Sequence, residues 1–249
     1  MTEQNATPPR RVFIAIPAHS GQIMVPTVCS LMASFHEVIE QGWALPELHV
    51  RSGDADLIRA RNALVAEFLK SECSDLLLVD ADISWGPGAF IRLVSHDVAF
   101  VAAAYRMRTD EFEHYPIIWP EKRRMCTDTK TGYPLVAAEG VPVGFCRLTR
   151  ACVERLVDSL DGAYFVDPVL PQEKVPWLFE FERHGIARME EGFSLCKRWR
   201  NLGGEIWVDP TINLGHSGVK TFPGDLGAMM AREVTESQQM KLRDIGFSI

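Results

Sequence analysis

The stretch Asp75–Asp82 (DLLLVDAD) decides the fold class of this 249-residue chain. Four consecutive apolar residues bounded by acids are too few for a helix, and they are typical of a strand buried on both faces of a parallel sheet. Asp80 and Asp82 follow this strand directly, and their i, i+2 spacing projects both side chains to the same side of an extended chain. We therefore predict a buried strand that delivers two carboxylates to one edge of a sheet.

Apolar runs and helical patterns alternate on both sides of this strand. Apolar spacing close to 3.6 residues predicts helices, and short apolar runs between them predict strands. The predicted elements are strands Val12–Ala18, Glu47–Val50 and Val98–Tyr105 and helices Val25–Gln41, Asp56–Lys70 and Gly88–Val94. This alternation predicts an α/β fold, with a mostly parallel sheet and helices on both faces.

The second half of the chain is less regular. Residues Thr109–Tyr133 favour a hairpin or a loop, and the Pro-containing, aromatic segment Asp161–His184 favours a loop. The other predicted elements are one or two strands within Pro134–Thr149, helix Arg150–Leu160, helix Glu191–Leu202, strand Glu205–Asp209 and a terminal helix Gly224–Arg243. Because no linker interrupts these elements, we expect a single domain over residues 1–249.

Composition excludes several classes of function. The chain has 26 Lys and Arg against 33 Asp and Glu, a net charge of −7, which argues against a basic nucleic-acid groove. No apolar stretch approaches the roughly 20 residues that span a bilayer, and the N-terminal apolar run is too short for a signal peptide. Six scattered cysteines without metal-type spacing suggest small buried hydrophobes in a reducing compartment. We expect a cytoplasmic protein without a transmembrane segment.

Ligands of parallel α/β sheets bind at the carboxyl ends of the strands. Pro17 lies at the end of the first predicted strand and His19 directly follows it, while Asp80 and Asp82 follow the third. The two carboxylates would repel each other there unless a cation lies beside them, which favours a hard divalent metal. The alternative is that both acids only end the strand and cap the next helix.

Together with the preceding helical segment Arg59–Asn62, this D-x-D resembles that of the GT-A-type glycosyltransferases, where it holds a metal and the diphosphate of a nucleotide sugar. Three further stretches resemble the small inverting, family 2-like members of this class, namely Gly140–Leu148, Glu190–Trp199 and Trp207–Gly218. The resemblance implies a GT-A-like, Rossmann-like domain. Its nucleotide-binding half would be residues 12–105, its acceptor and catalytic half residues 106–222, and its C-terminal helix residues 223–249.

The resemblance also implies the chemistry. It implies a glycosyltransferase that moves a sugar from a nucleotide-diphosphate donor to a hydroxyl acceptor. A glycan is the favoured acceptor, and a modified nucleobase is the alternative. Mn²⁺ or Mg²⁺ would be held by Asp82, with Asp80 and His216 assisting. The substrate-binding residues would be Pro17, His19, Arg61, Asp80 and Gly144.

An acidic side chain is needed to take the proton of the acceptor hydroxyl. Alignment of the family's acidic motif on Cys196 selects Glu191, whereas alignment on the acidic pair leaves both Glu190 and Glu191 open. A base in a single displacement implies inversion at the anomeric carbon. The alternative for this pair is stabilisation of a helix N-terminus by acids in its first turn.

Each of the other candidate residues also has a purely structural role as an alternative. His216 could be an ordinary hydrogen-bonded loop residue, and Arg61 could be a solvated charge or an ion pair with Glu67 or Asp54. Asp54 and Asp56 suit helix capping. The aromatic residues that could stack on an acceptor sugar, or equally belong to the core, are Trp85, Trp177 and Phe179.

Two other functions remain open at this point. A nucleotidyltransferase would also use paired carboxylates and magnesium on an α/β sheet, although the segment after the first strand is a poor version of the Gly-rich basic loop it needs. A non-catalytic nucleotide- or sugar-binding module is kept open by Gly192 at the second acidic position. The chain lacks G-x-G-x-x-G and G-x-x-x-x-G-K-[ST], the phosphate-binding motifs of dinucleotide oxidoreductases and P-loop enzymes, which argues against both classes.

Overall fold

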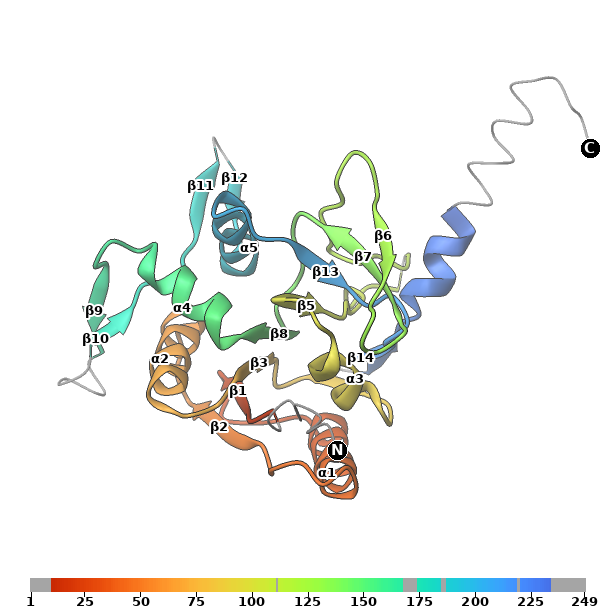
Figure 1. Ribbon diagram of the computed structural model, residues 1–249, viewed down its shortest axis with the longest axis horizontal. Coiled ribbons are helices and arrows are strands. Elements are labelled where there is room, and N and C mark those ends of the chain that lie inside the picture. Colours follow the sequence, from red (N-terminus) through yellow and green to blue (C-terminus); the bar gives the residue numbers. More distant parts are fainter. Residues whose placement is uncertain (1–9, 111, 168–173, 185–186, 219, 234–249) are drawn as a thin grey trace, which may run out of the picture.

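An eight-stranded sheet forms the centre of the computed structural model, which describes residues 10–110, 112–167, 174–184, 187–218 and 220–233 (Figure 1). The strand order is β2-β1-β3-β8-β5-β13-β7-β6. The strands are β1 (Val12–Ala18), β2 (Glu47–Ser52), β3 (Asp75–Val79), β5 (Phe100–Ala102), β6 (Met125–Thr127), β7 (Pro134–Ala138), β8 (Phe145–Thr149) and β13 (Ile206–Val208). All run in one direction except β7 and β8. The predicted α/β fold with a mostly parallel sheet is confirmed.

Helices cover both faces of this sheet, as predicted (Figure 1). The helices are α1 (Val25–Glu40), α2 (Leu57–Lys70), α3 (Ala89–Ser95), α4 (Arg150–Asp158) and α5 (Glu191–Asn201). One apolar cluster joins the sheet to α1 and α3, and a second joins its other face to α2, α4 and α5. Because side chains alternate along each strand, Leu76 and Leu78 enter the second cluster and Leu77 enters the first.

Local sequence signals explain where the helices begin. Asp56 caps α2, since its carboxylate accepts hydrogen bonds from the backbone N–H groups of Ile58 and Arg59. Thr149 caps α4 in the same way. The capping role suggested for Asp56 is confirmed, while Asp54 accepts the N–H of Asp56 and binds arginine side chains instead.

A small three-stranded sheet, in the order β15-β14-β4, adjoins the central one. Its strands are β4 (Ile83–Trp85), β14 (Leu214–Ser217) and β15 (Thr221–Pro223). The antiparallel pairing of β4 with β14 places His216 opposite Ile83, the residue that follows Asp82. This pairing brings the end of the sequence motif Trp207–Gly218 to the D-x-D.

The position of β8 places an antiparallel strand in the middle of the sheet. The fourth predicted strand is shorter, Phe100–Ala102, and it does not pair with β3, because β8 lies between them and is antiparallel to both. A strand buried on both faces is apolar throughout whichever way it runs, so its composition does not reveal its direction.

The expectation of a loop over Asp161–His184 was wrong. That segment contains the hairpin strands β9 (Tyr164–Val166) and β10 (Lys174–Pro176), and it ends with β11 (Glu182–His184), which pairs with β12 (Ala187–Met189). These strands have three residues each, too few for alternation to be recognised in the sequence. A terminal helix starts at residue 226, and the part of the prediction beyond residue 233 lies outside the described residues.

Two further properties bear on the sequence predictions. All six cysteines are free thiols, and Cys29 and Cys126 are exposed, so the expectation of burial holds for the other four. No helix among the described residues combines the length and the apolar character needed to cross a bilayer.

Candidate functional site

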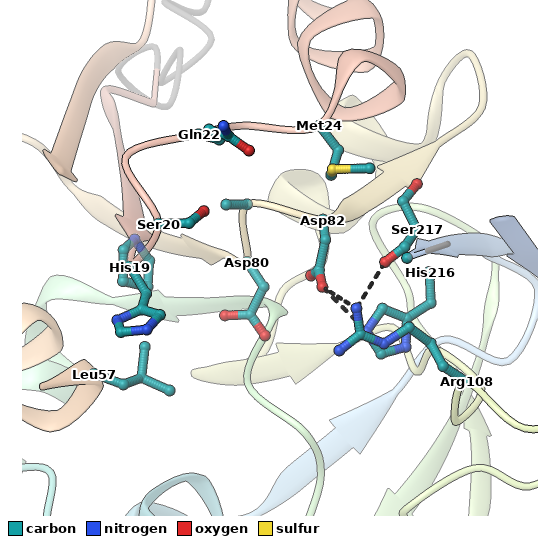
Figure 2. A pocket seen from close by; sticks show the side chains of 13 residues that line it. His19, Ser20, Gln22, Met24, Leu57, Asp80, Asp82, Arg108, His216 and Ser217 are labelled. Atoms are coloured by element: carbon teal, nitrogen blue, oxygen red, sulfur yellow. Dashed lines mark hydrogen bonds and ion pairs between the residues drawn. The ribbon is translucent and has the colours of Figure 1, made fainter. Parts of the chain in front are cut away.

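The carboxyl ends of β1 and β3 open into a cavity of about 550 Å³ (Figure 2). It brings together Pro17, His19, Asp80, Asp82 and His216, all of them singled out from the sequence. The other residues of the wall are Ser20, Gln22, Met24, Leu57, Ala81, Arg108, Ser217 and Gly218. Figure 2 shows His19 and Leu57 on one side of the two aspartates, and Arg108 and His216 on the other.

Backbone hydrogen bonds fix the loops around this cavity. The N–H of Met24 donates to the carbonyl of Ala81 at 2.8 Å, which ties the segment after β1 to the D-x-D. The N–H of Ser217 donates to the carbonyl of Asp82, also at 2.8 Å. Both walls are therefore attached to the backbone of the D-x-D.

His216 and Asp82 face each other across this junction. His216 Nε2 lies 3.5 Å from Asp82 Oδ2, and His216 Nδ1 lies 2.9 Å from the carbonyl oxygen of Arg106. A carbonyl only accepts, so in the neutral ring Nδ1 carries the hydrogen and Nε2 turns its lone pair towards the carboxylate. A backbone carbonyl that orients an imidazole in this way is typical of metal-binding histidines.

The donor set of Asp82 and His216 fits a divalent ion. Two ligands at a right angle around an ion with bonds of about 2.1 Å lie about 3.0 Å apart, so the observed separation needs only a small adjustment. Among the described residues, no group of three or more His, Cys, Asp or Glu side chains could hold a metal by itself. Mg²⁺ characteristically binds one or two carboxylates and completes its shell with water and substrate phosphates.

Asp80 has different partners from Asp82. Its Oδ1 accepts a hydrogen bond from Arg61 Nη2 at 2.6 Å, and its Oδ2 accepts one from the Tyr105 hydroxyl at 3.3 Å. Gly144 packs directly against it, since a Cβ at this glycine would lie 2.2 Å from Asp80 Oδ2. Both oxygens of Asp80 are thus engaged, and a direct bond to a metal would require one of these contacts to break.

Arg61 lies behind Asp80 and joins it to Glu191. Its side chain is 4% exposed, and its other terminal nitrogen, Nη1, forms an ion pair with Glu191 Oε1. Burial by itself lowers the pKa of Arg61, but the charges of Asp80 and Glu191 outweigh it and raise the pKa above its ordinary value. For Tyr105, burial and the charge of Asp80 both raise the pKa well above its ordinary value. Arg61 is therefore a buried bridge, and the alternatives of a solvated charge or an ion pair with Glu67 or Asp54 are wrong.

The two candidate bases lie outside the cavity lining. Glu191 is buried at the start of α5 and holds Arg61, whereas Glu190 is exposed and its carboxylate contacts Arg188 at 3.0 Å. Among the residues that line the cavity, the carboxylates are Asp80 and Asp82. Glu191 is consequently separated from the cavity by the guanidinium of Arg61, which contacts both Glu191 and the cavity residue Asp80.

Charged groups support the side of the cavity on which His19 lies. His19 Nδ1 lies 3.1 Å from the carbonyl oxygen of Asp54, whose carboxylate binds Arg59 and Arg51. Arg51 in turn forms an ion pair with the buried Asp167 beside β9. This network fixes the loop after β2 next to His19.

The aromatic candidates divide between core and surface. Phe179 and Trp85 are buried, so a stacking role for them is wrong. Trp177 is 47% exposed and meets the ring of Phe165 edge-on, with centroids 5.2 Å apart.

No family model matches the chain, and no curated protein does. Among solved structures, A197 from STIV has a TM-score of 0.51 at 12% identity, over 84% of this chain and 86% of that one. GalNAc-T7 with UDP, GalNAc and Mn²⁺ has a TM-score of 0.48 at 14% identity, over 85% of this chain and 44% of that one. A glycosyltransferase involved in glycosylation of the major capsid of PBCV-1 has a TM-score of 0.32 at 10% identity, over 61% and 67%.

These values show that the chain shares its fold with A197 from STIV.

Proposed function

We propose that this chain is a metal-dependent glycosyltransferase that moves a sugar from a nucleotide-diphosphate donor to a hydroxyl acceptor. The observation that carries the proposal is the convergence of Asp82, Asp80 and His216 on one cavity at the carboxyl ends of β1 and β3. A lone D-x-D would only end a strand, but the small sheet brings an oriented imidazole to the same carboxylate.

Different residues of the cavity would bind different parts of the donor. Asp82 and His216 would hold Mn²⁺ or Mg²⁺, which supplies Lewis-acid neutralisation of the leaving diphosphate. Pro17 and His19 would contact the nucleoside at the other end. Asp80, held by Arg61 and Tyr105 against Gly144, would accept hydrogen bonds from hydroxyl groups of the donor.

For the acceptor, we propose Glu191 as general base, with Glu190 as the second candidate. The acceptor hydroxyl must come within hydrogen-bond reach of the base, so Glu191 would exchange its contact with Arg61 for the hydroxyl. A single displacement with such a base inverts the anomeric configuration. The exposed Trp177 beside Phe165 is the stacking surface that we propose for a glycan acceptor.

A thermal-shift screen tests donor binding. Nucleoside diphosphates and nucleotide sugars of each common base would be added with Mn²⁺ or with EDTA. We expect one base to stabilise the protein only with Mn²⁺, by about 2.7 kcal/mol at 100 times its Kd. Asp82→Ala and His216→Ala should lose this shift, whereas Asp110→Ala, which removes an exposed carboxylate paired with Lys220, should keep it. The absence of a shift with every nucleotide would contradict the proposal.

One observation favours a second candidate, a nucleotide-binding module without turnover. Glu191 is engaged by a buried arginine, and Glu190 points to Arg188 on the surface. A metal-dependent nucleotide shift together with no release of sugar from any nucleotide sugar, alone or with glycan acceptors, would support the module.

A further inference from the structure

Arg108 lies on the same carboxylate oxygen that the proposed metal would use. Its Nη1 lies 3.2 Å from Asp82 Oδ2, and it also donates to the carbonyl oxygen of Ser217 at 3.0 Å. His216 Nε2 approaches that same oxygen of Asp82 at 3.5 Å. In Figure 2 the guanidinium lies beside Asp82, on the side where His216 lies.

A guanidinium and a divalent ion cannot both occupy this place. The metal would have to lie about 2.1 Å from Asp82 Oδ2, and the positive charges of the ion and of Arg108 would repel each other at that distance. Binding of the ion therefore requires Arg108 to leave Asp82.

Arg108 can leave more readily than Arg61, the other arginine at the D-x-D. The Arg108 side chain is 47% exposed, and one nitrogen makes both of its contacts here. Arg61 is 4% exposed and is held by two carboxylates, those of Asp80 and Glu191. Exposed ion pairs are weak because water solvates both partners, so the contact with Asp82 is easily exchanged.

The backbone of Gly218 supports the present position of Arg108. A Cβ at Gly218 would lie 2.9 Å from Arg108 Cδ, in the middle of the side chain, so any larger residue would displace it. This contact offers a way to move the guanidinium without removing its charge.

We propose that Arg108 takes the place of the divalent ion on Asp82 in the ligand-free protein, and that it moves to the diphosphate of the donor when the ion binds. The inference rests on the proposed function and assigns a diphosphate-binding role to a residue of the cavity wall. The planar guanidinium matches phosphate oxygens in bidentate geometry, and Arg108 already lines the cavity. Ion and diphosphate should therefore bind with positive coupling, each removing the obstacle to the other.

Titration of Mn²⁺ alone, followed by the EPR signal of the free ion, tests the first half of this exchange. We expect Arg108→Gln and Gly218→Ala to bind Mn²⁺ several-fold more tightly than the parent, because the competing guanidinium is gone or displaced. Lys220→Gln removes the same unit of charge from a residue whose described ion pair is with Asp110, and it should resemble the parent. Asp82→Asn should abolish binding in both the parent and the Arg108→Gln background.

The second half is tested with methylenediphosphonate, a diphosphate analogue, at saturating Mn²⁺. Arg108→Gln should weaken its binding about tenfold, as expected for loss of a charge-assisted hydrogen bond. If Arg108→Gln and Gly218→Ala bind Mn²⁺ no more tightly than the parent, the exchange is wrong, while a nucleotide shift of the parent would still support the proposed function. If neither the parent nor Arg108→Gln binds Mn²⁺, the exchange and the metal site both fail.

Discussion

Arg61 Nη2 lies 2.6 Å from Asp80 Oδ1, and this ion pair connects α2 to the first carboxylate of the D-x-D. The same guanidinium holds Glu191 at the start of α5. Three segments that are distant in the sequence thus depend on one buried cation.

Replacement of Arg61 by Met should destabilise the protein by about 3 kcal/mol. The change leaves two carboxylates without their partner, and an uncompensated buried charge is costly. Chemical denaturation measures the loss. Lys220→Met, which removes an exposed ion pair, should change the stability by no more than about 0.5 kcal/mol, and an equal effect of both variants would show that Arg61 is not a buried bridge.

Glu191→Gln should lower the rate of sugar transfer by a factor of about 10²–10⁴, because the amide cannot take a proton from the acceptor. Donor affinity should remain, since Glu191 does not line the cavity. Glu190→Gln is the matched variant, with the same change at the neighbouring position, and it should keep its transfer rate. A parent-like rate for Glu191→Gln together with an inactive Glu190→Gln would reverse the assignment.

Gly144→Ala should weaken metal-dependent nucleotide binding about tenfold. The added methyl group would lie 2.2 Å from Asp80 Oδ2 and 2.8 Å from the Tyr105 ring, so Asp80 must move. Gly86→Ala adds the same methyl group where no heavy atom lies within 4 Å. Isothermal titration calorimetry of both variants compares the affinities, and equal values would mean that the position of Asp80 is unimportant.

The acid stability of the protein should depend on Asp54. Burial alone would raise the pKa of Asp54, but hydrogen bonds from Arg59, the Asp56 N–H and Arg51 lower it from 3.8 to about 2. The stabilising contribution is therefore present above about pH 4 and is lost as the pH falls towards 2. Denaturation measured between about pH 5 and pH 2, a range set by these pKa values, gives the free energy of unfolding at each pH. As the pH falls, this free energy should decrease more steeply for the parent than for Asp54→Asn. Parallel curves would exclude this contribution.

The sequence predicted the part of the site that local pattern controls. An apolar run followed by two acids predicted both the buried strand β3 and the location of Asp80 and Asp82 at its carboxyl end. The place of His216 followed only from a resemblance, because its approach to Asp82 depends on the pairing of β4 with β14, two short strands far apart in the chain.

The remaining contacts of the site join residues that are far apart in the sequence, and the periodicity of apolar residues does not predict such contacts. Arg61 is at a position of α2 where a solvent-exposed or buried arginine gives the same pattern, and only the fold reveals Asp80 and Glu191 around it. Tyr105 and Arg108 follow β5, at the edge where β1 and β3 also end, but only the fold reveals their contacts with Asp80 and Asp82. The direction of β8 is likewise invisible in an apolar run.

The insertion of β8 between β3 and β5 also affects how the protein is made. During synthesis, β1, β2 and β3 leave the ribosome first. One edge of β3 then stays unpaired until β8 (Phe145–Thr149) has been made. Until then, a strand that is apolar on both faces has an open edge, the condition under which strands pair with foreign chains. Residues 12–105 are therefore a poor unit for separate expression, and nascent chains that stall before residue 149 should need protection by chaperones.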